Sequence, residues 1–578
     1  MAISEMIPSW PGLPDPSGPV LPNKSLRGRQ YRLRSKDHTS FDLESILRAR
    51  GIEERESFLR PNLRRDMPDP MSLANMDKAS KRIAQAVTRQ EKVLIFGDYD
   101  VDGACASAIF VRWFAGLGQQ VDVYIPDRFA DGYGPSVPAL KKAKADTYDL
   151  VIFVDCGTAA REVIDAMQSD VVIVDHHLPQ GVVPSVIALV NPHLQDDFSG
   201  LGMLCAGALC FMAVVATQAV LKDDGYFGEA SPPNLKYLLE LVALCSVADV
   251  VPLVGPGRLF TAKGLEVMRT SPSPAISALM RVASVEDISA GRIGFALGPR
   301  INAGGRVGGG SSEVDGALGV RLLTSTDEHE VNDIAERLNK MNAKRQAVEA
   351  DCISEAMDAA EIQDAMGQPI IAVYGNDWHP GVVGIVAGRI KERFDKPTIV
   401  AAMVEGLLSG SGRSVPGFNL GDVIVEAKGK GLLVGGGGHA MACGLKCDPA
   451  KWNEFMAFLQ DRETIELTPI EIDARATAAS LGQYAIDDME LLQPLGQGMP
   501  NIRLAIEKFR ITASRYFGKG HLRLECGPGL EAIIWNAEKD AYYEDRLDGA
   551  VVTLIGTPKM NHFRGVTKIS IDVQDIIE

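Results

Sequence analysis

The sequence predicts a mixed α/β protein, in which a parallel-sheet domain is joined by a long helix to a second, smaller α/β domain and is followed by a C-terminal β-barrel. Three observations predict this fold: short apolar runs between segments of helical length, a long stretch without glycine or proline, and C-terminal strands that alternate with glycine turns. At 578 residues the chain is too long for a single hydrophobic core.

The first α/β region begins at Val93. Its apolar runs are rich in β-branched residues, which is typical of parallel strands that are buried on both faces. The runs are VLIF (93–96), VDVYI (121–125), LVIFVD (150–155), VVIVD (171–175) and VIALV (186–190). Ligands of such sheets bind beyond the carboxyl ends of the strands, so the chemistry is expected there.

A long helix is predicted over residues 330–362, which contain neither glycine nor proline and have apolar residues at helical spacing. A second α/β unit begins at Pro369, and strands with glycine turns follow from about Thr464. The predicted parts are an N-terminal appendage (1–60), the parallel-sheet domain (61–325), the connecting helix (326–366), the second α/β domain (367–460) and the barrel (461–578).

The composition is that of a globular protein, with 46% hydrophobic and 23% charged residues. We find no uninterrupted apolar run of about 18 residues, and the N-terminus lacks the basic start and apolar core of a secretory signal. The nine cysteines are scattered, and Cys443 and Cys447 have no partner pair at zinc-finger spacing. We therefore expect a cytoplasmic protein with no membrane partner and no structural zinc.

The net charge of −16 is unusual for a protein that binds nucleic acid, because phosphate contacts normally use an excess of Lys and Arg. A metal site concentrates carboxylates of its own, however, and an acidic exterior can coexist with a basic groove. The total charge therefore excludes neither class of function.

Carboxylates crowd the end of the first predicted strand, where FGDYDVDG contributes Asp98, Asp100 and Asp102. Three carboxylates so close together repel one another unless a cation neutralises them. The alternative is a solvated acidic turn, which the preceding buried strand and the following apolar segment disfavour. An EF-hand loop is excluded because no glutamate occupies its closing position.

Two more predicted strands end in chemically active residues. Asp155 ends LVIFVD, and Asp175, His176 and His177 follow VVIV. A lone histidine is more often structural, but two adjacent histidines after a buried strand, in a chain with nine, favour a function. Asp249 lies in the apolar segment ALCSVADVVPL, where an unpaired carboxylate would be costly.

Aspartate and histidine ligands without paired cysteines suit Mn²⁺ or Mg²⁺ better than structural zinc. Two such ions can activate a water molecule and stabilise both the entering and the leaving oxygen of a phosphoester displacement. The residues themselves therefore favour phosphodiester hydrolysis.

The motifs DYDVDG, VDCG, VDHH and SVADVVPL resemble, in order, the four motifs of the DHH phosphoesterase superfamily, and the last has the form seen in RecJ-type exonucleases. The resemblance implies catalytic roles for Asp155, His176 and His177, with His177 beside the scissile phosphate. It also implies two Mn²⁺ or Mg²⁺ ions held by Asp98, Asp100, Asp102, Asp155, His176 and Asp249, with Asp155 as a bridge.

Three glycine-rich segments, GPRINAGGRVGGG, LSGSGRSVPGFNL and GGGGHAMACG, have the composition of loops that bind anions. Each alone could be an ordinary turn. They and NDWHPGVVGIVAGRIKERF resemble substrate-binding segments of the RecJ type, which implies DNA contacts from Arg128, Arg300, Arg306, His379, Ser411, Arg413 and His439. Arg128, Ser411 and Arg413 would capture a 5′-terminal phosphate, which implies the 5′→3′ direction.

The C-terminal segment ELLQPLGQGMPNIRL and the strands after it are similar to the OB-fold of these enzymes, so an OB-like barrel is expected to hold the strand. Candidate contacts are Phe517, Lys519, His521 and Arg523, although an ordinary polar hairpin is equally compatible with them. The resemblance implies hydrolysis of single-stranded DNA to 5′-mononucleotides in recombination and repair. We expect a monomer, with a RecQ-type helicase and a single-strand-binding protein as candidate partners.

Two alternatives stay open. A short-oligonucleotide or cyclic-dinucleotide phosphodiesterase of the same superfamily would use the same chemistry, but such proteins usually resemble only the two core domains. A catalytically inactive DNA-binding scaffold, like the DHH relative in the eukaryotic replicative helicase, would not be expected to keep every acidic motif intact.

Overall fold

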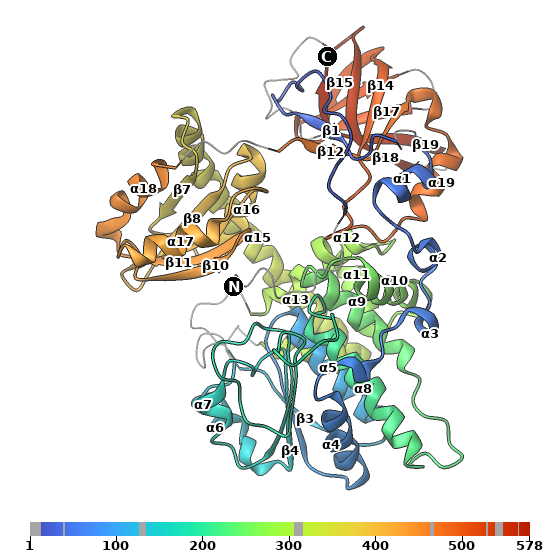
Figure 1. The fold of residues 1–578 in the computed structure, drawn as a ribbon, viewed down its shortest axis with the longest axis vertical. Helices are drawn as coiled ribbons and strands as arrows, with labels where there is room; N and C mark the ends of the chain where they lie inside the picture. Colours follow the sequence, from blue (N-terminus) through green and yellow to red (C-terminus); the bar gives the residue numbers. More distant parts are fainter. Residues whose placement is uncertain are drawn as a thin grey trace. The chain divides into compact units, whose positions relative to one another are not determined.

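The computed structural model describes residues 13–37, 41–126, 134–305, 316–462, 468–518, 520–526, 530–537, 547–563 and 566–578. They divide into two compact units (Figure 1). The first unit contains the N-terminal segment, the parallel sheet and the C-terminal sheet. The second unit contains the residues from Arg337 to Thr468.

A five-stranded parallel sheet forms the base of the first unit, in the order β3-β2-β4-β5-β6. Its strands are β2 (Val93–Phe96), β3 (Asp122–Tyr124), β4 (Leu150–Val154), β5 (Asp170–Val174) and β6 (Ala188–Val190). β2 and β4 are fully buried because helices cover both faces of the sheet. The predicted parallel sheet is confirmed.

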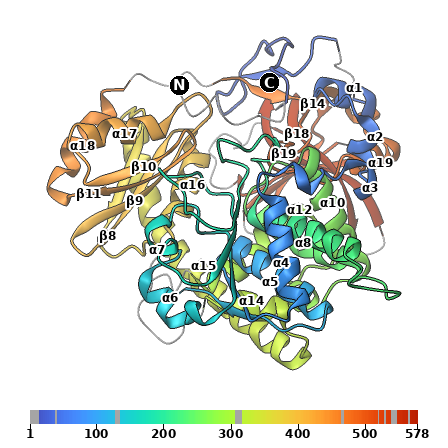
Figure 2. The same cartoon turned by 60° about the horizontal axis from the view of Figure 1, so that its bottom comes forward.

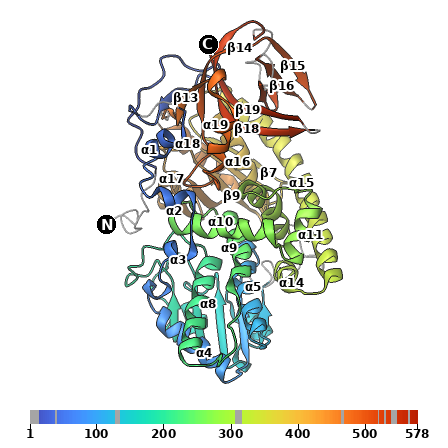
Figure 3. The same cartoon turned by 90° about the vertical axis from the view of Figure 1, so that its right-hand side faces the viewer.

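The two faces of this sheet are covered by different helices. One face packs against α4 (Met76–Thr88), α5 (Val101–Gly116) and α8 (Ala206–Asp223), of which α4 and α8 lie side by side (Figure 3). The other face packs against α6 (Val137–Ala143) and α7 (Arg161–Ile164). All connections run between parallel strands, so the strands end together at one edge of the sheet.

Within the described part of the chain, α8 is the one helix that is long and apolar enough to cross a membrane by length and composition. The protein itself buries 67% of that helix. Buried core helices share this composition, because they are apolar on every side.

A helical region follows the parallel sheet. Its helices are α9 (Leu239–Ala248), α10 (Gly255–Thr270), α11 (Pro274–Val282), α12 (Ala290–Arg292), α13 (Gly298–Ala303) and α14 (Leu318–Thr324). Helices α9 and α10 pack closely, since a Cβ at Gly264 would lie 2.1 Å from the carbonyl oxygen of Leu239.

The long helix α15 (Glu328–Ala365) leads into the second unit and confirms the predicted helix. A mixed five-stranded sheet follows, in the order β10-β11-β9-β8-β7. Its strands are β7 (Ile371–Gly375), β8 (Thr398–Val404), β9 (Leu407–Arg413), β10 (Gly435–His439) and β11 (Ala442–Cys447). Helix α16 (Val383–Phe394) packs on one face, and α17 (Leu420–Gly429) and α18 (Trp452–Gln460) pack on the other (Figure 2).

The prediction that the glycine-rich segments are loops is wrong for most of their described residues. GPRINA forms helix α13, and GGGGH and ACG belong to the antiparallel strands β10 and β11. Composition misleads here because glycine also serves where backbones pack closely. A Cβ at Gly436 would lie 2.8 Å from Cγ2 of Ile424 on α17.

The C-terminal sheet has seven strands, in the order β13-β14-β18-β19-β17-β16-β15. They are β13 (Ala474–Thr477), β14 (Leu504–Arg510), β15 (Ala513–Phe517), β16 (His521–Glu525), β17 (Leu530–Ile534), β18 (Val551–Phe563) and β19 (Val566–Ile577). One helix, α19 (Gln483–Glu490), lies between β13 and β14 along the chain. Alternating burial along β16 is typical of a sheet with one covered face.

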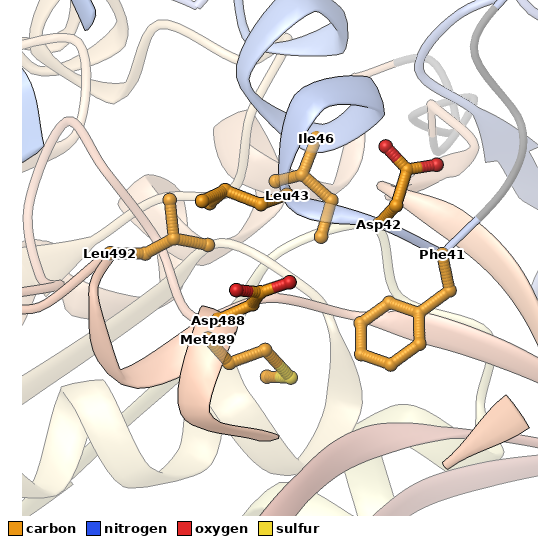
Figure 4. A pocket seen from close by; sticks show the side chains of 7 residues that line it. All are labelled: Phe41, Asp42, Leu43, Ile46, Asp488, Met489 and Leu492. Carbon is orange, nitrogen blue, oxygen red and sulfur yellow. The ribbon is translucent and has the colours of Figure 1, made fainter. Parts of the chain in front are cut away.

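The N-terminal segment packs against this C-terminal sheet. Strand β1 (Tyr31–Leu33) pairs in parallel with β12 (Ile470–Ile472), and α1 (Leu43–Ala49) lies against α19. A small pocket between the two helices is lined by Phe41, Asp42, Leu43, Ile46, Asp488, Met489 and Leu492 (Figure 4). The helices α2 (Arg55–Leu59) and α3 (Leu63–Asp66) then lead towards the parallel sheet. The division of the chain into five domains stays a prediction.

Candidate metal centre and substrate-binding face

The carboxyl ends of three neighbouring strands bring predicted metal ligands together. Asp98 and Asp100 follow β2, Asp155 follows β4, and His176 follows β5. One oxygen from each of Asp98, Asp100 and Asp155 lies within 4.8 Å of the others. Nε2 of His176 lies 3.3 Å from Oδ1 of Asp155. These four residues form one cluster.

Asp155 has a left-handed backbone conformation, with φ at 59°. Such a conformation costs a non-glycine residue on the order of 1–3 kcal/mol, and it is found most often at functional sites. The Asp155 N–H donates to the carbonyl oxygen of Val174 on β5, at 3.1 Å. The residue is 2% exposed, and its Oδ1 has no hydrogen-bond partner among the described residues.

Asp102, in the first turn of α5, faces the first turn of α8. Its Oδ2 accepts a hydrogen bond from the N–H of Ala206 at 2.7 Å, and its Oδ1 accepts one from Gly207 at 2.8 Å. The positive end of the α8 dipole therefore stabilises this buried carboxylate. Its Oδ2 lies 3.7 Å from Nε2 of His176, so Asp102 belongs to the same cluster.

Asp249 closes the cluster from the C-terminal end of α9. Its Oδ2 lies 3.8 Å from Nδ1 of His176, and its side chain is 36% exposed. Burial, with the nearby charges of Asp102 and Asp100, raises the pKa of Asp249 to about 8. Because its side chain is partly exposed, Asp249 marks the side of the cluster that solvent reaches.

Asp175 holds His177 in place. Its Oδ1 lies 2.8 Å from Nδ1 of His177, and its Oδ2 accepts a hydrogen bond from the N–H of Thr158 at 3.0 Å. Burial alone would raise the pKa of Asp175, but the hydrogen bonds from His177 and Thr158 outweigh it and lower the pKa to about 2. Asp175 thus stays charged and orients the imidazole.

The buried carboxylates repel one another strongly. Burial and the charges of four other aspartates raise the pKa of Asp155 well above its usual value. Burial likewise raises the pKa of Asp102. A divalent cation among these oxygens would remove the repulsion and would use the unbonded Oδ1 of Asp155, so the residues fit a metal ion.

Oxygen and imidazole groups are the available ligands. The thiols of Cys205 and Cys245 lie close to Asp102, but burial raises their pKa values well above the usual value. Among the described residues, three of the four candidate metal-binding groups consist only of aspartates and histidines, and such a donor set suits Mn²⁺ or Mg²⁺.

The sequence analysis missed two features of this site. Asn191 directly follows β6 and donates from Nδ2 to Thr158 Oγ1 and to the His177 carbonyl oxygen, both at 2.9 Å. Its place after the run VIALV could have revealed it. The N–H groups of Ala206 and Gly207 had no local signal, because Asp102 is more than a hundred residues away.

The segment around Arg300 reaches the metal cluster from α13. Oδ1 of Asn302 accepts a hydrogen bond from the N–H of Val101 at 3.2 Å, and a Cβ at Gly305 would lie 2.5 Å from the ring of Tyr99. Burial lowers the pKa of Arg300, whose Nη1 donates to the Ala296 carbonyl oxygen at 2.6 Å. The predicted contacts Arg128 and Arg306 lie outside the described residues.

The second unit brings Ser411 and Arg413 together near the start of α16. Nη1 of Arg413 donates to Oγ of Ser411 at 3.0 Å. A Cβ at Gly384, in the first turn of α16, would lie 3.1 Å from Arg413 Nη2 and from Ser411 Oγ. A guanidinium, a hydroxyl and a helix N-terminus thus converge, which is an arrangement that suits phosphate.

His439 and His379 belong to the same region of the second unit. Arg413 and His439 are both paired with Ala442, so the side chains of Arg413, His439 and Ala442 point to one face of the sheet. His379 precedes α16, and its Nδ1 accepts a hydrogen bond from the N–H of Gly381 at 3.0 Å.

On the face that carries Arg413, the middle of β10 and β11 is a strip of bare glycine backbone, bordered by the side chains of His439, Ala442 and Lys446. Cβ atoms at Gly435, Gly437 and Gly444 would meet nothing within 4 Å. The pairing of Gly437 with Gly444, and of Gly444 with Ser411, places this bare strip beside the arginine. The open backbone beside Ser411 and Arg413 leaves room for an extended ligand.

The C-terminal sheet gathers aromatic and basic side chains near its predicted contacts. Rings of Phe517 and His521 lie 5.5 Å apart, and the Arg523 guanidinium lies 4.8 Å from the Phe517 ring centre. Trp535, which the sequence analysis missed, lies 4.8 Å from His521 and is 45% exposed. Lys519 lies outside the described residues.

Three family models match the chain. They are the DHH family, N-terminal domain, at residues 92–242, the DHHA1 domain at residues 367–463, and the RecJ OB domain at residues 472–575.

Individual proteins are similar over most of the chain. The single-stranded-DNA-specific exonuclease RecJ of Salmonella typhimurium is 32% identical over 581 residues, which cover 95% of this chain and 99% of that protein. RecJ of Thermus thermophilus, solved in complex with Mn²⁺, has a TM-score of 0.74 at 24% identity and covers 93% of this chain and 76% of its own.

A crystal structure of an exonuclease RecJ bound to manganese is 28% identical, with a TM-score of 0.53, and covers 67% of this chain and 94% of its own. The three family models cover the parallel sheet, the second sheet and the OB domain. The chain therefore belongs to the RecJ family of single-stranded-DNA-specific exonucleases.

Proposed function

We propose that this protein is a metal-dependent exonuclease that hydrolyses single-stranded DNA from its 5′ end and releases 5′-mononucleotides, in recombination and repair. The convergence of Asp98, Asp100, Asp102, Asp155, His176 and Asp249 on one edge of the parallel sheet supports it. Two bound Mn²⁺ or Mg²⁺ ions would supply an activated water molecule and neutralise charge on the phosphate.

The protein residues have separate tasks in this reaction. Asp155 is central to the cluster and would be among the residues that hold the metal ions, and the amides at the start of α8 hold the Asp102 carboxylate in position. His177 is 41% exposed and fixed by Asp175, so it can donate a hydrogen bond to the scissile phosphate.

The direction of hydrolysis is proposed from the second unit. Ser411, Arg413 and the start of α16 offer a site for a terminal phosphate, to which His379 and His439 add further donors. Arg128, Arg300 and Arg306 complete the proposed set of DNA contacts. The OB domain, with its aromatic and basic side chains, supports a long strand rather than a dinucleotide.

Cellular context forms part of the proposal. We propose a cytoplasmic, monomeric enzyme without a membrane partner that acts with a RecQ-type helicase and a single-strand-binding protein. A helicase would supply the single strand, since unwinding must precede hydrolysis of duplex DNA.

The test is hydrolysis of matched single- and double-stranded DNA, labelled at either end, in Mn²⁺ by the wild-type protein and by Asp155→Asn. We expect mononucleotides from the 5′ end of the single strand, and loss of hydrolysis with retained strand binding in the variant. Preferential degradation of the duplex, or undiminished turnover by Asp155→Asn, would contradict the proposal.

A further inference from the structure

The loop that follows Asp249 is anchored in the core of the OB domain. Leu253, four positions after Asp249, is 2% exposed and belongs to the same apolar cluster as Leu495 and Met499. The N–H of Leu253 donates to the carbonyl oxygen of Gln497 at 2.8 Å. Asp249, a predicted metal ligand, is thus connected to the C-terminal sheet through the contacts of Leu253, four positions later in the chain.

The contacting segment of the OB domain, Leu495–Met499, is a tight turn with little space for a side chain at its two glycines. Gly496 and Met499 exchange backbone hydrogen bonds at 2.8 and 3.2 Å. A Cβ at Gly498, whose φ is +69°, would lie 3.0 Å from Cβ of Pro252. A Cβ at Gly496 would lie 2.9 Å from Cδ1 of Leu253. Both glycines permit close approach to the Asp249 loop.

A buried arginine fixes the beginning of this turn to the catalytic domain. Arg258, on α10, is 2% exposed and donates to the carbonyl oxygens of Leu492, Gln493 and Pro494 at 3.0, 2.8 and 2.7 Å. Its Nε donates a hydrogen bond to the carbonyl oxygen of Phe58 at 2.8 Å. Arg258 therefore fixes the residues just before the turn, and Leu253 contacts the turn itself.

Val250, the residue after Asp249, has a strained backbone conformation that neighbouring contacts must stabilise. Val250 has φ at 59°, a costly conformation for a β-branched residue, yet its side chain is 59% exposed and held by little packing. Its conformation depends on its neighbours, because the Val251 N–H bonds to the Ser246 carbonyl oxygen at 2.8 Å and Leu253 is fixed in the OB core.

We propose that the turn Leu495–Met499 is a brace that positions the Asp249 carboxylate, so that the OB domain helps to build the metal site of the catalytic domain. Gly498 and Leu253 are positioning residues in this device. The inference rests on the proposed role of Asp249 as a metal ligand.

The test compares Mn²⁺ binding, measured by calorimetry on the full chain, in Gly498→Ala and in a matched control. Gly549→Ala changes a glycine of the same domain with φ at +81° and no atom within 4 Å of its Cβ, so it introduces similar backbone strain without the contact. We expect Mn²⁺ affinity to fall about tenfold in Gly498→Ala and to remain unchanged in Gly549→Ala.

A second variant, Gly496→Ala, tests the same proposal in case Gly498→Ala does not fold. Gly496→Ala presses on Leu253 at an ordinary backbone conformation, and it should weaken Mn²⁺ binding in the same direction even where Gly498→Ala does not fold. Thermal unfolding in EDTA verifies the fold of each variant. The Mn²⁺ concentration needed for hydrolysis should rise while the KM for DNA stays constant, which a general loss of structure would not produce.

The variant Asp249→Asn tests separately whether Asp249 is a metal ligand, so that failure of the brace can be distinguished from failure of the ligand assignment. If Asp249→Asn weakens Mn²⁺ binding but both glycine variants bind like Gly549→Ala, the brace is overturned and the proposed function stands. If Asp249→Asn leaves Mn²⁺ binding unchanged, the assignment of Asp249 fails and the brace fails with it.

Discussion

Oδ1 of Asp175 lies 2.8 Å from Nδ1 of His177 and also accepts hydrogen bonds from the N–H groups of His176 and His177, at 2.8 and 3.2 Å. One buried carboxylate therefore fixes both the turn after β5 and the ring of His177. The neighbouring histidine, His176, remains directed at Asp102 and Asp155.

Asp175→Asn should lower the rate of DNA hydrolysis about 10- to 100-fold, as expected when the partner that orients an active-site imidazole is lost. Strand affinity should not change, because Asp175 is 1% exposed. Single-turnover kinetics and a binding titration measure the two effects. The exposed Glu162→Gln on α7 serves as the control, and an equal rate in both variants would contradict the role of Asp175.

Arg413→Gln should weaken the recognition of a 5′-phosphate. A hydrogen bond to a charged group is worth about 1.5–3 kcal/mol, so the KM for 5′-phosphorylated strands should rise about 10- to 100-fold. Strands with a 5′-hydroxyl should be affected much less. Arg389→Gln on α16, where the side chain is 56% exposed, is the control. An equal loss on both substrates would show that Arg413 does not bind the terminal phosphate.

Gly437→Leu should obstruct the bare strip of the second sheet. The added side chain has open space, so the free energy of unfolding should change little, while the KM for DNA should rise about tenfold from the lost contact area. Gly429→Leu adds the same side chain at an open position on α17. DNA binding that is equal in the two variants would rule out a role for the strip.

Asp473 should make the protein sensitive to acid. It is 3% exposed, and Nε of Arg50 donates to its Oδ1 at 2.8 Å. Burial alone would raise the pKa of Asp473. This effect is outweighed by the charges of Arg50 and Arg34 and by hydrogen bonds from Arg50 and from the N–H of Arg503, so the pKa lies below its usual value of 3.8.

A carboxylate with a lowered pKa in the folded state contributes its full stabilisation above the unfolded value, and the stabilisation is lost as the pH falls through the folded pKa. Asp473→Asn should cost about 3–5 kcal/mol of unfolding free energy at pH 7 and should reduce the acid dependence below pH 4. Urea unfolding at several pH values measures both. Glu507→Gln removes the partly exposed pair with Arg475 and should cost about 1 kcal/mol or less. Equal losses in the two variants would contradict this account.

The strands that carry the metal site are predictable from sequence, because β-branched apolar runs mark parallel strands that are buried on both faces. The run VLIF coincides with β2, and Asp155 follows β4 directly. Since parallel strands end at one edge, the convergence of Asp98, Asp155 and His176 follows from their positions after strands.

Other features depend on contacts that have no local signal. The amides that hold Asp102 come from α8, and the turn that braces Asp249 comes from residues 495–499, more than two hundred positions away. The composition of the glycine-rich segments predicts loops, but the glycines around Gly412 and Gly436 allow strands to pack against α17. Composition cannot separate these two uses of glycine.

The most direct test of the account is anomalous scattering from a crystal soaked in Mn²⁺ with a 5′-phosphorylated oligonucleotide. We predict two manganese peaks about 3.5–4 Å apart, with Asp155 bound to both and with His176 and Asp249 among the other ligands. Manganese bound elsewhere, with the Asp155 carboxylate free of metal, would contradict the central claim.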